Sequence, residues 1–171
     1  LIIDDRANGG GNVSPMILER LAREPYRLTM RRGSSRVGTV PDAVQVGPKV
    51  CLINKYSASD GDLFPWGFRA LGLGKLIGTR TWGGIVGISG PLPYMDGTDI
   101  RVPFFTSYDP KTGSWIIENH GVDPDILIDN DPIKEWNGED QQLDRAIQEV
   151  MKELQSRKPL PGIPAPRDFS K

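Results

Sequence analysis

The sequence predicts an α/β domain with a mostly parallel central sheet, a β-hairpin excursion and a C-terminal helix. Two segments carry this prediction, because each runs from an apolar strand through a turn of small residues into a helix. In the first, "LIIDD" leads through "RANGGGN" into "VSPMILERLARE", where Ile17, Leu18 and Leu21 recur at helical spacing. In the second, "KVCLINK" precedes "SASDGDLFPWGFRALGLG", a helical pattern that ends at glycines. Strands that alternate with helices in this way pair in parallel.

The segment between these two units is expected to be irregular apart from one strand. "YRLTMRR" is typical of a strand, and residues 33–48 indicate a polar loop, because Gly and Pro interrupt any longer period. The basic cluster Arg31, Arg32 and Arg36 is expected on a solvated face of that loop.

The second half of the chain begins with a third short strand at residues 75–80. "DIRVPFFTSY" and "SWIIEN" then indicate an antiparallel hairpin around the turn "DPKTG". The clearest helical pattern of the chain is "EDQQLDRAIQEVMKELQ". We expect one packed unit over residues 1–157 and a proline-rich, non-helical tail over residues 158–171.

Composition is that of an ordinary globular domain, with 37% hydrophobic and 25% charged residues. With 21 basic and 22 acidic residues, we expect neither nucleic acid nor a membrane surface as a partner. A cytoplasmic location is a separate expectation that does not rest on the charge. The single cysteine, Cys51, lies in a buried-strand pattern, which excludes a disulfide framework and a cysteine-rich metal site.

The stretch "SASDGD", residues 57–62, poses the main chemical question of the sequence. Ser57 and Asp60 stand three apart before an apolar helix, which resembles a capping box with Ser57 as the cap. Ser59 is left without a structural task, in a first helical turn where backbone N–H groups point outward. A hydroxyl there can attack a carbonyl, and the Asp60 N–H can bind the resulting oxyanion.

The second oxyanion donor is expected from the "NGGG" turn. Gly9, Gly10 and Gly11 permit close backbone approach and positive φ. They follow a strand of the same sheet, at the edge where α/β proteins bind ligands. A helix cap and a tight strand-to-helix link without function are the structural alternatives.

Three motifs in order resemble the tricorn-type branch of the C-terminal processing peptidases, serine proteases with a crotonase- and ClpP-like α/β fold. They are "IIDDRANGGGNVS", "INKYSASDGDLFPWGFRALGLGKLIGTRTWGGIVGI" and "IENHGVDPDI", and they cover roughly residues 1–130. The resemblance implies that Ser59 is the nucleophile and that the Asp60 N–H forms half of the oxyanion hole. It assigns the other half to a glycine of the turn, Gly10 or Gly11.

The resemblance also bears on the general base. Ordinary processing peptidases carry a lysine in the segment after "GTRTWG", and here that position is Gly84, which excludes a Ser-Lys dyad at that site. The tricorn branch pairs the serine with a histidine and a glutamate, and the resemblance places the glutamate at Glu118, to orient the imidazole. The family's histidine comes from a region before the part represented here. Because the chain begins abruptly without Met, we expect a fragment of a longer polypeptide.

Other candidates are given structural tasks. His120 would share a face with Glu118 on a strand, so a catalytic His120 stays an alternative to a surface residue. Lys75 is expected to be solvated. Asp123 and Asp125 surround a proline and are expected to form a turn, with no metal site.

These observations predict part of a serine peptidase that cleaves short or unfolded peptides by acyl transfer, needs no cofactor and forms a homo-oligomer as the full-length protein. Without the upstream histidine, the isolated chain is expected to be inactive. The alternatives are a non-catalytic crotonase-like module for peptide binding or oligomerisation, and an acyl-CoA enzyme of the crotonase type.

Overall fold

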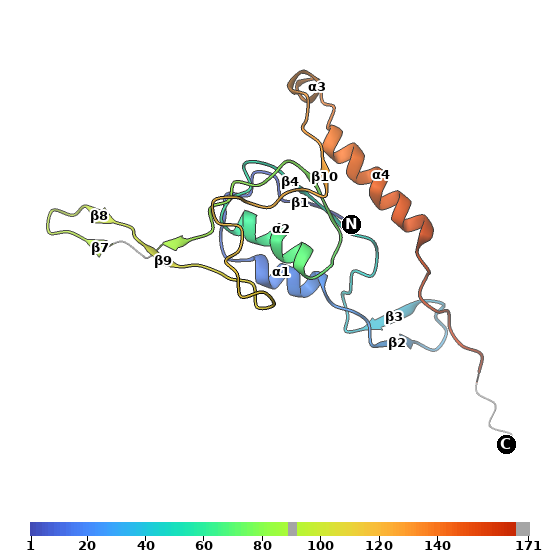
Figure 1. Cartoon of the computed structure of the whole chain (residues 1–171). Helices are drawn as coiled ribbons and strands as arrows, with labels where there is room; N and C mark the ends of the chain where they lie inside the picture. The colour runs from blue at the N-terminus through green and yellow to red at the C-terminus, as the bar shows by residue number, and fades with distance from the viewer. Residues whose placement is uncertain (89–91, 167–171) are drawn as a thin grey trace.

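The computed structural model describes residues 1–88 and 92–166 (Figure 1). At its centre is a four-stranded sheet in the order β1-β4-β5-β10. The strands are β1 (Ile2–Asp4), β4 (Val50–Ile53), β5 (Lys75–Gly78) and β10 (Ile126–Leu127). All three pairings are parallel, so the predicted α/β class with a parallel central sheet is confirmed.

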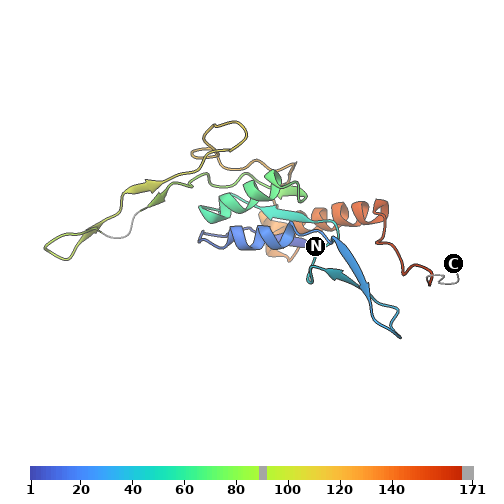
Figure 2. The ribbon, with the colours of Figure 1, turned by 90° about the horizontal axis from the view of Figure 1, so that it is seen from below.

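Helices cover both faces of this sheet. On one face α1 (Ser14–Leu21) and α2 (Asp60–Ala70) lie side by side (Figures 1 and 2). The other face carries α4 (Gln141–Ser156), the predicted C-terminal helix, which begins where the Asp140 side chain accepts the Leu143 N–H at 3.0 Å. Before it comes the short helix α3 (Pro132–Trp136), capped by the side chain of Asp131.

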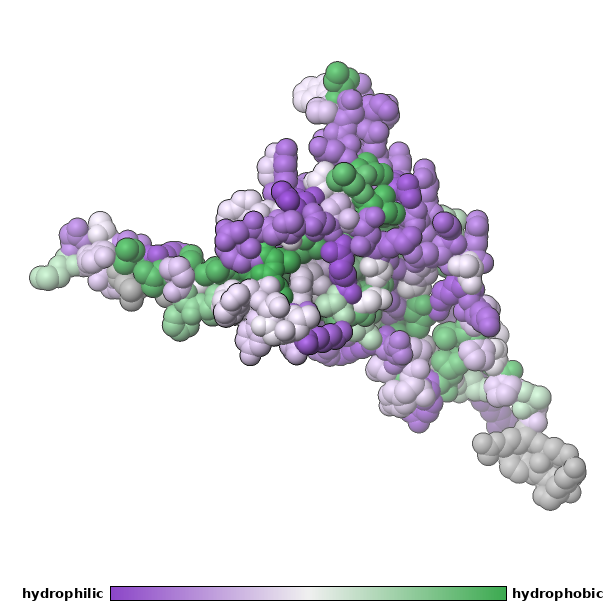
Figure 3. Space-filling model, viewed as in Figure 1, coloured by the Kyte–Doolittle hydropathy of each residue, from purple (hydrophilic) through white to green (hydrophobic). Residues whose placement is uncertain are grey.

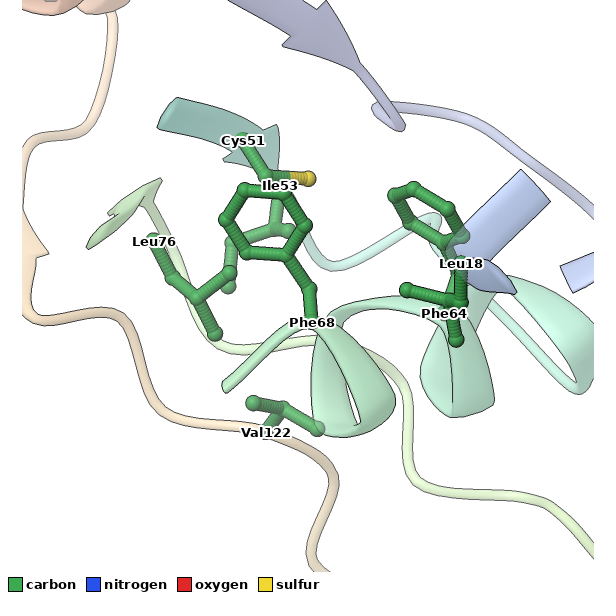
Figure 4. Close-up of a cluster of buried hydrophobic side chains, with 7 residues drawn as sticks. All are labelled: Leu18, Cys51, Ile53, Phe64, Phe68, Leu76 and Val122. Carbon is green, nitrogen blue, oxygen red and sulfur yellow. The ribbon is translucent and has the colours of Figure 1, made fainter. Parts of the chain in front are cut away.

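The core is split by β4, whose four residues are all fully buried. Val50 and Leu52 pack with Ala146 of α4, and the alternate residues Cys51 and Ile53 pack toward α1 and α2. Burial on both faces explains why this strand is continuously apolar. The residues of the cluster under α1 and α2 are Leu18, Cys51, Ile53, Phe64, Phe68, Leu76 and Val122 (Figure 4).

The loop predicted over residues 33–48 is wrong in part, because it contains a strand. β2 (Arg27–Met30) pairs antiparallel with β3 (Val37–Val40) in a small sheet of its own. The flanking glycines and prolines hid a four-residue strand whose valines have high β propensity.

The β-hairpin excursion is confirmed, but its predicted pairing is wrong. β9 (Pro103–Phe105) pairs with β6 (Gly87–Ile88), and β8 (Asp99–Ile100) pairs with β7 (Leu92–Pro93). The expected partner "SWIIEN" contributes a single bridge, between Tyr108 and Trp115, and then bends into a turn. The resulting arm extends away from the body of the molecule and carries apolar residues along its length (Figures 1 and 3).

The segment after α4 contains neither helix nor strand between residues 158 and 166. Its residues 161–164 lie beside β2 and β3. Across residues 1–88 and 92–166, no helix has both the length and the apolar character to span a membrane.

Candidate active site

The parallel pairing of β1 with β4 brings together the two segments that follow these strands. The Asn8 carbonyl accepts the Ala58 N–H at 2.8 Å, which ties the glycine turn to the start of α2. Glycine is required at both sides of this contact. A Cβ at Gly61 would collide with the Asn8 carbonyl, and a Cβ at Gly10 would lie 2.8 Å from the Ser59 Cβ. The glycine turn therefore lies directly against Ser59.

Ser59 is the N-cap of α2, with φ 57° and ψ −114°. A positive φ is unusual for a residue other than glycine and is held in place by its surroundings. The prediction that Ser57 is the cap is wrong. Ser57 is buried, its Oγ donates to the Asp5 carbonyl at 2.8 Å, and the same Oγ accepts the Asn54 N–H at 3.2 Å. The helix begins two residues later than predicted, because residues 54–57 form a separate turn closed by the Ser57 N–H.

Asp62 holds the unusual backbone of Ser59. Its carboxylate is fully buried, and Oδ2 accepts the Ser59 N–H at 2.9 Å. The same carboxylate accepts the N–H of Gly83 at 2.7 Å and that of Gly84 at 3.2 Å. Sequence reasoning missed this residue, although it stands three positions after Ser59, as the carboxylate of a capping box does.

In the part of the chain that the structure describes, the backbone N–H groups of Asp60 and of two residues of the glycine turn, Gly9 and Gly11, have no hydrogen-bond partner. The Gly10 N–H, in contrast, donates to the Asn8 Oδ1 at 3.1 Å. The Asp60 side chain points away from this site and caps α1, where Oδ2 accepts the N–H groups of Val13 and Ser14, each at 3.0 Å.

Glu118 lies on a turn rather than on a strand, so the strand geometry predicted for Glu118 and His120 is wrong. Its Oε2 accepts the N–H groups of Ile85 at 2.6 Å and Val86 at 3.0 Å. These two residues directly follow Gly83 and Gly84, which are bound to Asp62. One continuous loop, residues 83–86, thus connects the turn of Ser59 with the carboxylate of Glu118.

His120 does not join this arrangement. Its Nε2 lies 2.6 Å from the Asp123 Oδ2, and both side chains are more than half exposed. Asp125 also has a structural task beyond the predicted turn, since Oδ2 accepts the Leu76 N–H and Oδ1 binds Arg69 at 2.9 Å. Within the described ranges, histidine, cysteine and carboxylate side chains do not gather in threes as metal ligands.

Lys75 is exposed at the start of β5, as predicted, and it also forms an ion pair. Its Nζ lies 2.8 Å from the Glu149 Oε2, so it ties β5 to α4 on the face of the sheet opposite α2. Gly84, which occupies the position expected for a lysine base, lies under the ring of Trp82, where a Cβ would collide with that ring.

Asp5 is a further residue that sequence reasoning missed. Only 5% of it is exposed, beneath the glycine turn, and its Oδ1 accepts the Asn8 Nδ2 at 2.9 Å. Burial raises the pKa of Asp5 to about 7, and the negative charges of Asp60, Asp4 and Asp62 act in the same direction.

The fold and this arrangement define an α/β domain in which a serine with positive φ at the start of a helix lies against a glycine turn. A family model described as "Peptidase family S41" matches residues 1–128, and the chain belongs to that family.

The chain is similar to tricorn-type members of the family. It is 43% identical to the tricorn protease of Thermoplasma volcanium over 92% of this chain and 15% of the relative. It is 40% identical to tricorn protease homolog 1 of Streptomyces coelicolor, over 86% of this chain and 14% of the relative. A crystal structure of the tricorn protease superposes with a TM-score of 0.83 at 41% identity, covering 91% of this chain and 15% of that one. The chain thus spans about one seventh of the length of the relatives it matches.

Proposed function

We propose that this chain is the nucleophile-bearing part of a serine peptidase catalytic core, over residues 1–157, and that residues 158–171 form a tail outside it. The observation that carries the proposal is the position of Ser59, at a helix start with positive φ and against Gly10 of the glycine turn, while the Asp60 N–H has no partner among the described residues. Such donors stabilise charge that appears in the transition state and need no rearrangement when it does.

In the proposed reaction the Ser59 Oγ attacks the carbonyl carbon of a peptide bond, and its proton passes to a histidine. The oxyanion is bound by the N–H groups of Asp60 and Gly11. Gly11 is the better donor because the Gly10 N–H already donates to Asn8. Gly10 serves instead by having no side chain, since a Cβ there would lie 3.2 Å from the Ser59 Oγ. The C–N bond then breaks, the amine leaves with the proton, and water hydrolyses the acyl-serine.

Glu118 is proposed to orient that histidine. Its Oε2 is fixed by two backbone N–H groups, while its Oε1 has no hydrogen-bond partner among the described residues and can accept an imidazole N–H. The histidine itself is proposed to come from outside these 171 residues, because His120 is turned to Asp123. Peptides as substrates, and a homo-oligomeric full-length protein, belong to the same proposal by similarity to the tricorn proteases.

One observation favours a second candidate. Ser59 is the N-cap of α2, so its presence also has a purely structural reason. A non-catalytic module for peptide binding or oligomerisation would use the same turn without any chemistry.

A fluorophosphonate probe separates the two candidates, because it reacts with an activated serine and not with a capping serine. The experiment uses a longer polypeptide that contains this chain, with Ser59→Ala and Ser57→Ala as matched variants. We expect labelling in the parent protein and in Ser57→Ala, and none in Ser59→Ala. A folded parent protein that is never labelled would leave the non-catalytic module as the better description.

A further inference from the structure

The side chain of Asp5 is a buried acid with incomplete hydrogen bonding. It follows β1 and lies under the glycine turn, with the Asn8 Nδ2 donating to its Oδ1 at 2.9 Å. Its Oδ2 is buried and has no hydrogen-bond partner in residues 1–88 and 92–166. Oδ2 is therefore unsatisfied in either protonation state, and in a buried site the cost is greater for the charged carboxylate than for the neutral acid.

The charges around Asp5 also oppose its ionisation. Asp4 precedes it in the chain, and Asp60 and Asp62 face it from α2. The nearest cation in sequence, Arg6, is engaged by Asp4 at 2.7 Å and by Asp140 at 2.8 Å. The remaining titratable neighbour is the buried Cys51 thiol of β4, whose own pKa is raised by its burial and by the charge of Asp5. The pKa of Asp5 is accordingly raised to about 7.

Asn8 connects this acid to the proposed oxyanion hole. Its Nδ2 is held by Asp5, its Oδ1 accepts the Gly10 N–H at 3.1 Å, and its carbonyl accepts the Ala58 N–H at 2.8 Å. Because these bonds use both ends of the side-chain amide, the orientation of the amide is fixed. Asn8 therefore sets the glycine turn and the residue before Ser59 relative to each other.

An acid is a poor choice for stability at this position. Asparagine would offer Asn8 the same acceptor oxygen without a group that ionises among three carboxylates. A residue that costs stability next to a functional site is a candidate for a functional role.

We propose that Asp5 is a positioning residue of the oxyanion hole, which holds Asn8 through its Oδ1 in either protonation state and weakens the hole when it ionises. The inference rests on the proposed peptidase function. The physical reason is that a negative charge on Asp5, connected to the glycine turn through Asn8, opposes the oxyanion that the Gly11 and Asp60 N–H groups bind. The site thereby has an upper pH limit that is independent of the general base.

Two substitutions distinguish the hydrogen bond that Asp5 accepts from Asn8 from the effect of the negative charge on Asp5. Asp5→Asn keeps an acceptor for Asn8 and cannot ionise, whereas Asp5→Leu removes the acceptor as well. His120→Gln is the control, because it removes the only histidine of the chain.

The first measurement is NMR on this chain, following the Asp5 carboxyl carbon and the amides of Gly10 and Ala58 between pH 5 and 9. We expect all three signals to move with one midpoint near 7, in the parent chain and in His120→Gln, and the two amides to stop moving in Asp5→Asn. Amides that do not move with Asp5, or that stop moving in His120→Gln, overturn the inference.

The second measurement is the rate of fluorophosphonate labelling against pH in a longer polypeptide that contains this chain. We expect the ratio of the Asp5→Asn rate to the parent rate to rise through the midpoint and then to level off at the factor by which ionisation slows the reaction, and Asp5→Leu to react slowly at every pH. Labelling of Ser59 with parallel pH profiles in Asp5→Asn and the parent overturns this inference alone. A folded parent that is not labelled at any pH overturns the proposed function, and the role of Asp5 with it.

Discussion

The carboxylate of Asp62 accepts the backbone N–H of Ser59 at 2.9 Å, and through this bond it stabilises the positive φ of that serine. The same carboxylate binds Gly83 and Gly84, which lead into the residues that bind Glu118. One buried side chain thus fixes the distance between the proposed nucleophile and the proposed orienting acid.

Asp62→Ala is expected to lower the free energy of unfolding by several kcal/mol, because each of three N–H groups left without an acceptor costs about 1–3 kcal/mol. Denaturant unfolding of this chain measures the loss. Asp62→Asn keeps one acceptor oxygen, so its stability should lie between those of the parent and Asp62→Ala. Asp96→Ala, in an exposed turn, is the control. An Asp62→Ala protein as stable as the Asp96→Ala protein would contradict this account.

Ser57→Ala is expected to affect mainly stability, and Ser59→Ala mainly the reactivity of the site. Removing the buried Ser57 hydroxyl leaves the Asp5 carbonyl and the Asn54 N–H without their partner, which should cost about 1–3 kcal/mol of stability. Removing the partly exposed Ser59 hydroxyl should cost about 1 kcal/mol or less and abolish fluorophosphonate labelling. Thermal unfolding and labelling, measured side by side, test the pair. Turnover that persists in Ser59→Ala would remove the nucleophile assignment.

Glu118→Gln retains an oxygen that can accept the N–H groups of Ile85 and Val86, but it loses the charge that favours a protonated imidazole. In a longer, active protein we expect kcat to fall by orders of magnitude with KM little changed. Steady-state kinetics with a peptide substrate separate the two constants. A change confined to KM would make Glu118 a contact of the substrate instead.

Because the pKa of Asp5 is raised on folding, the free energy of unfolding is expected to depend on pH. The unfolded chain releases this proton near pH 3.8, whereas the folded chain retains it until about pH 7. Between these values the unfolded state binds fewer protons, so the contribution of Asp5 to the free energy of unfolding falls as the pH rises, and it levels off above about pH 7. Asp5→Asn should remove this slope and be more stable than the parent at pH 8. Urea unfolding at a series of pH values measures it, and identical slopes in both proteins would refute it.

This chain by itself is expected to fold without cleaving peptides, because we propose no base for the Ser59 proton among the described residues: His120 binds Asp123, and Gly84 stands where the resemblance expects a lysine base. A fluorogenic peptide assay on the isolated chain tests this. In a longer active protein, His120→Ala should retain most activity. Ser59-dependent hydrolysis by the isolated chain would show that His120, or another group within the chain, acts as the base.

The sequence by itself determined the local features of this protein. Two strand-turn-helix units, the apolar run of β4 and the long amphipathic pattern of α4 each depend on residues close together in the chain, and all three are present. Three motifs in order were enough to indicate the peptidase family. The helix start was misplaced because "SASDGD" contains two overlapping capping patterns, and local spacing cannot choose between them.

The tertiary structure decided whatever depends on contacts between distant segments. It paired β9 with β6 rather than with residues 114–119, and it turned His120 toward Asp123. It also placed Asp5 beneath the glycine turn and Asp62 between Ser59 and the loop of residues 83–86. Burial and the neighbouring charges set the pKa of a carboxyl, and both arise when separate segments pack together. Neither burial nor the neighbouring charges can be predicted from the spacing of residues along the chain.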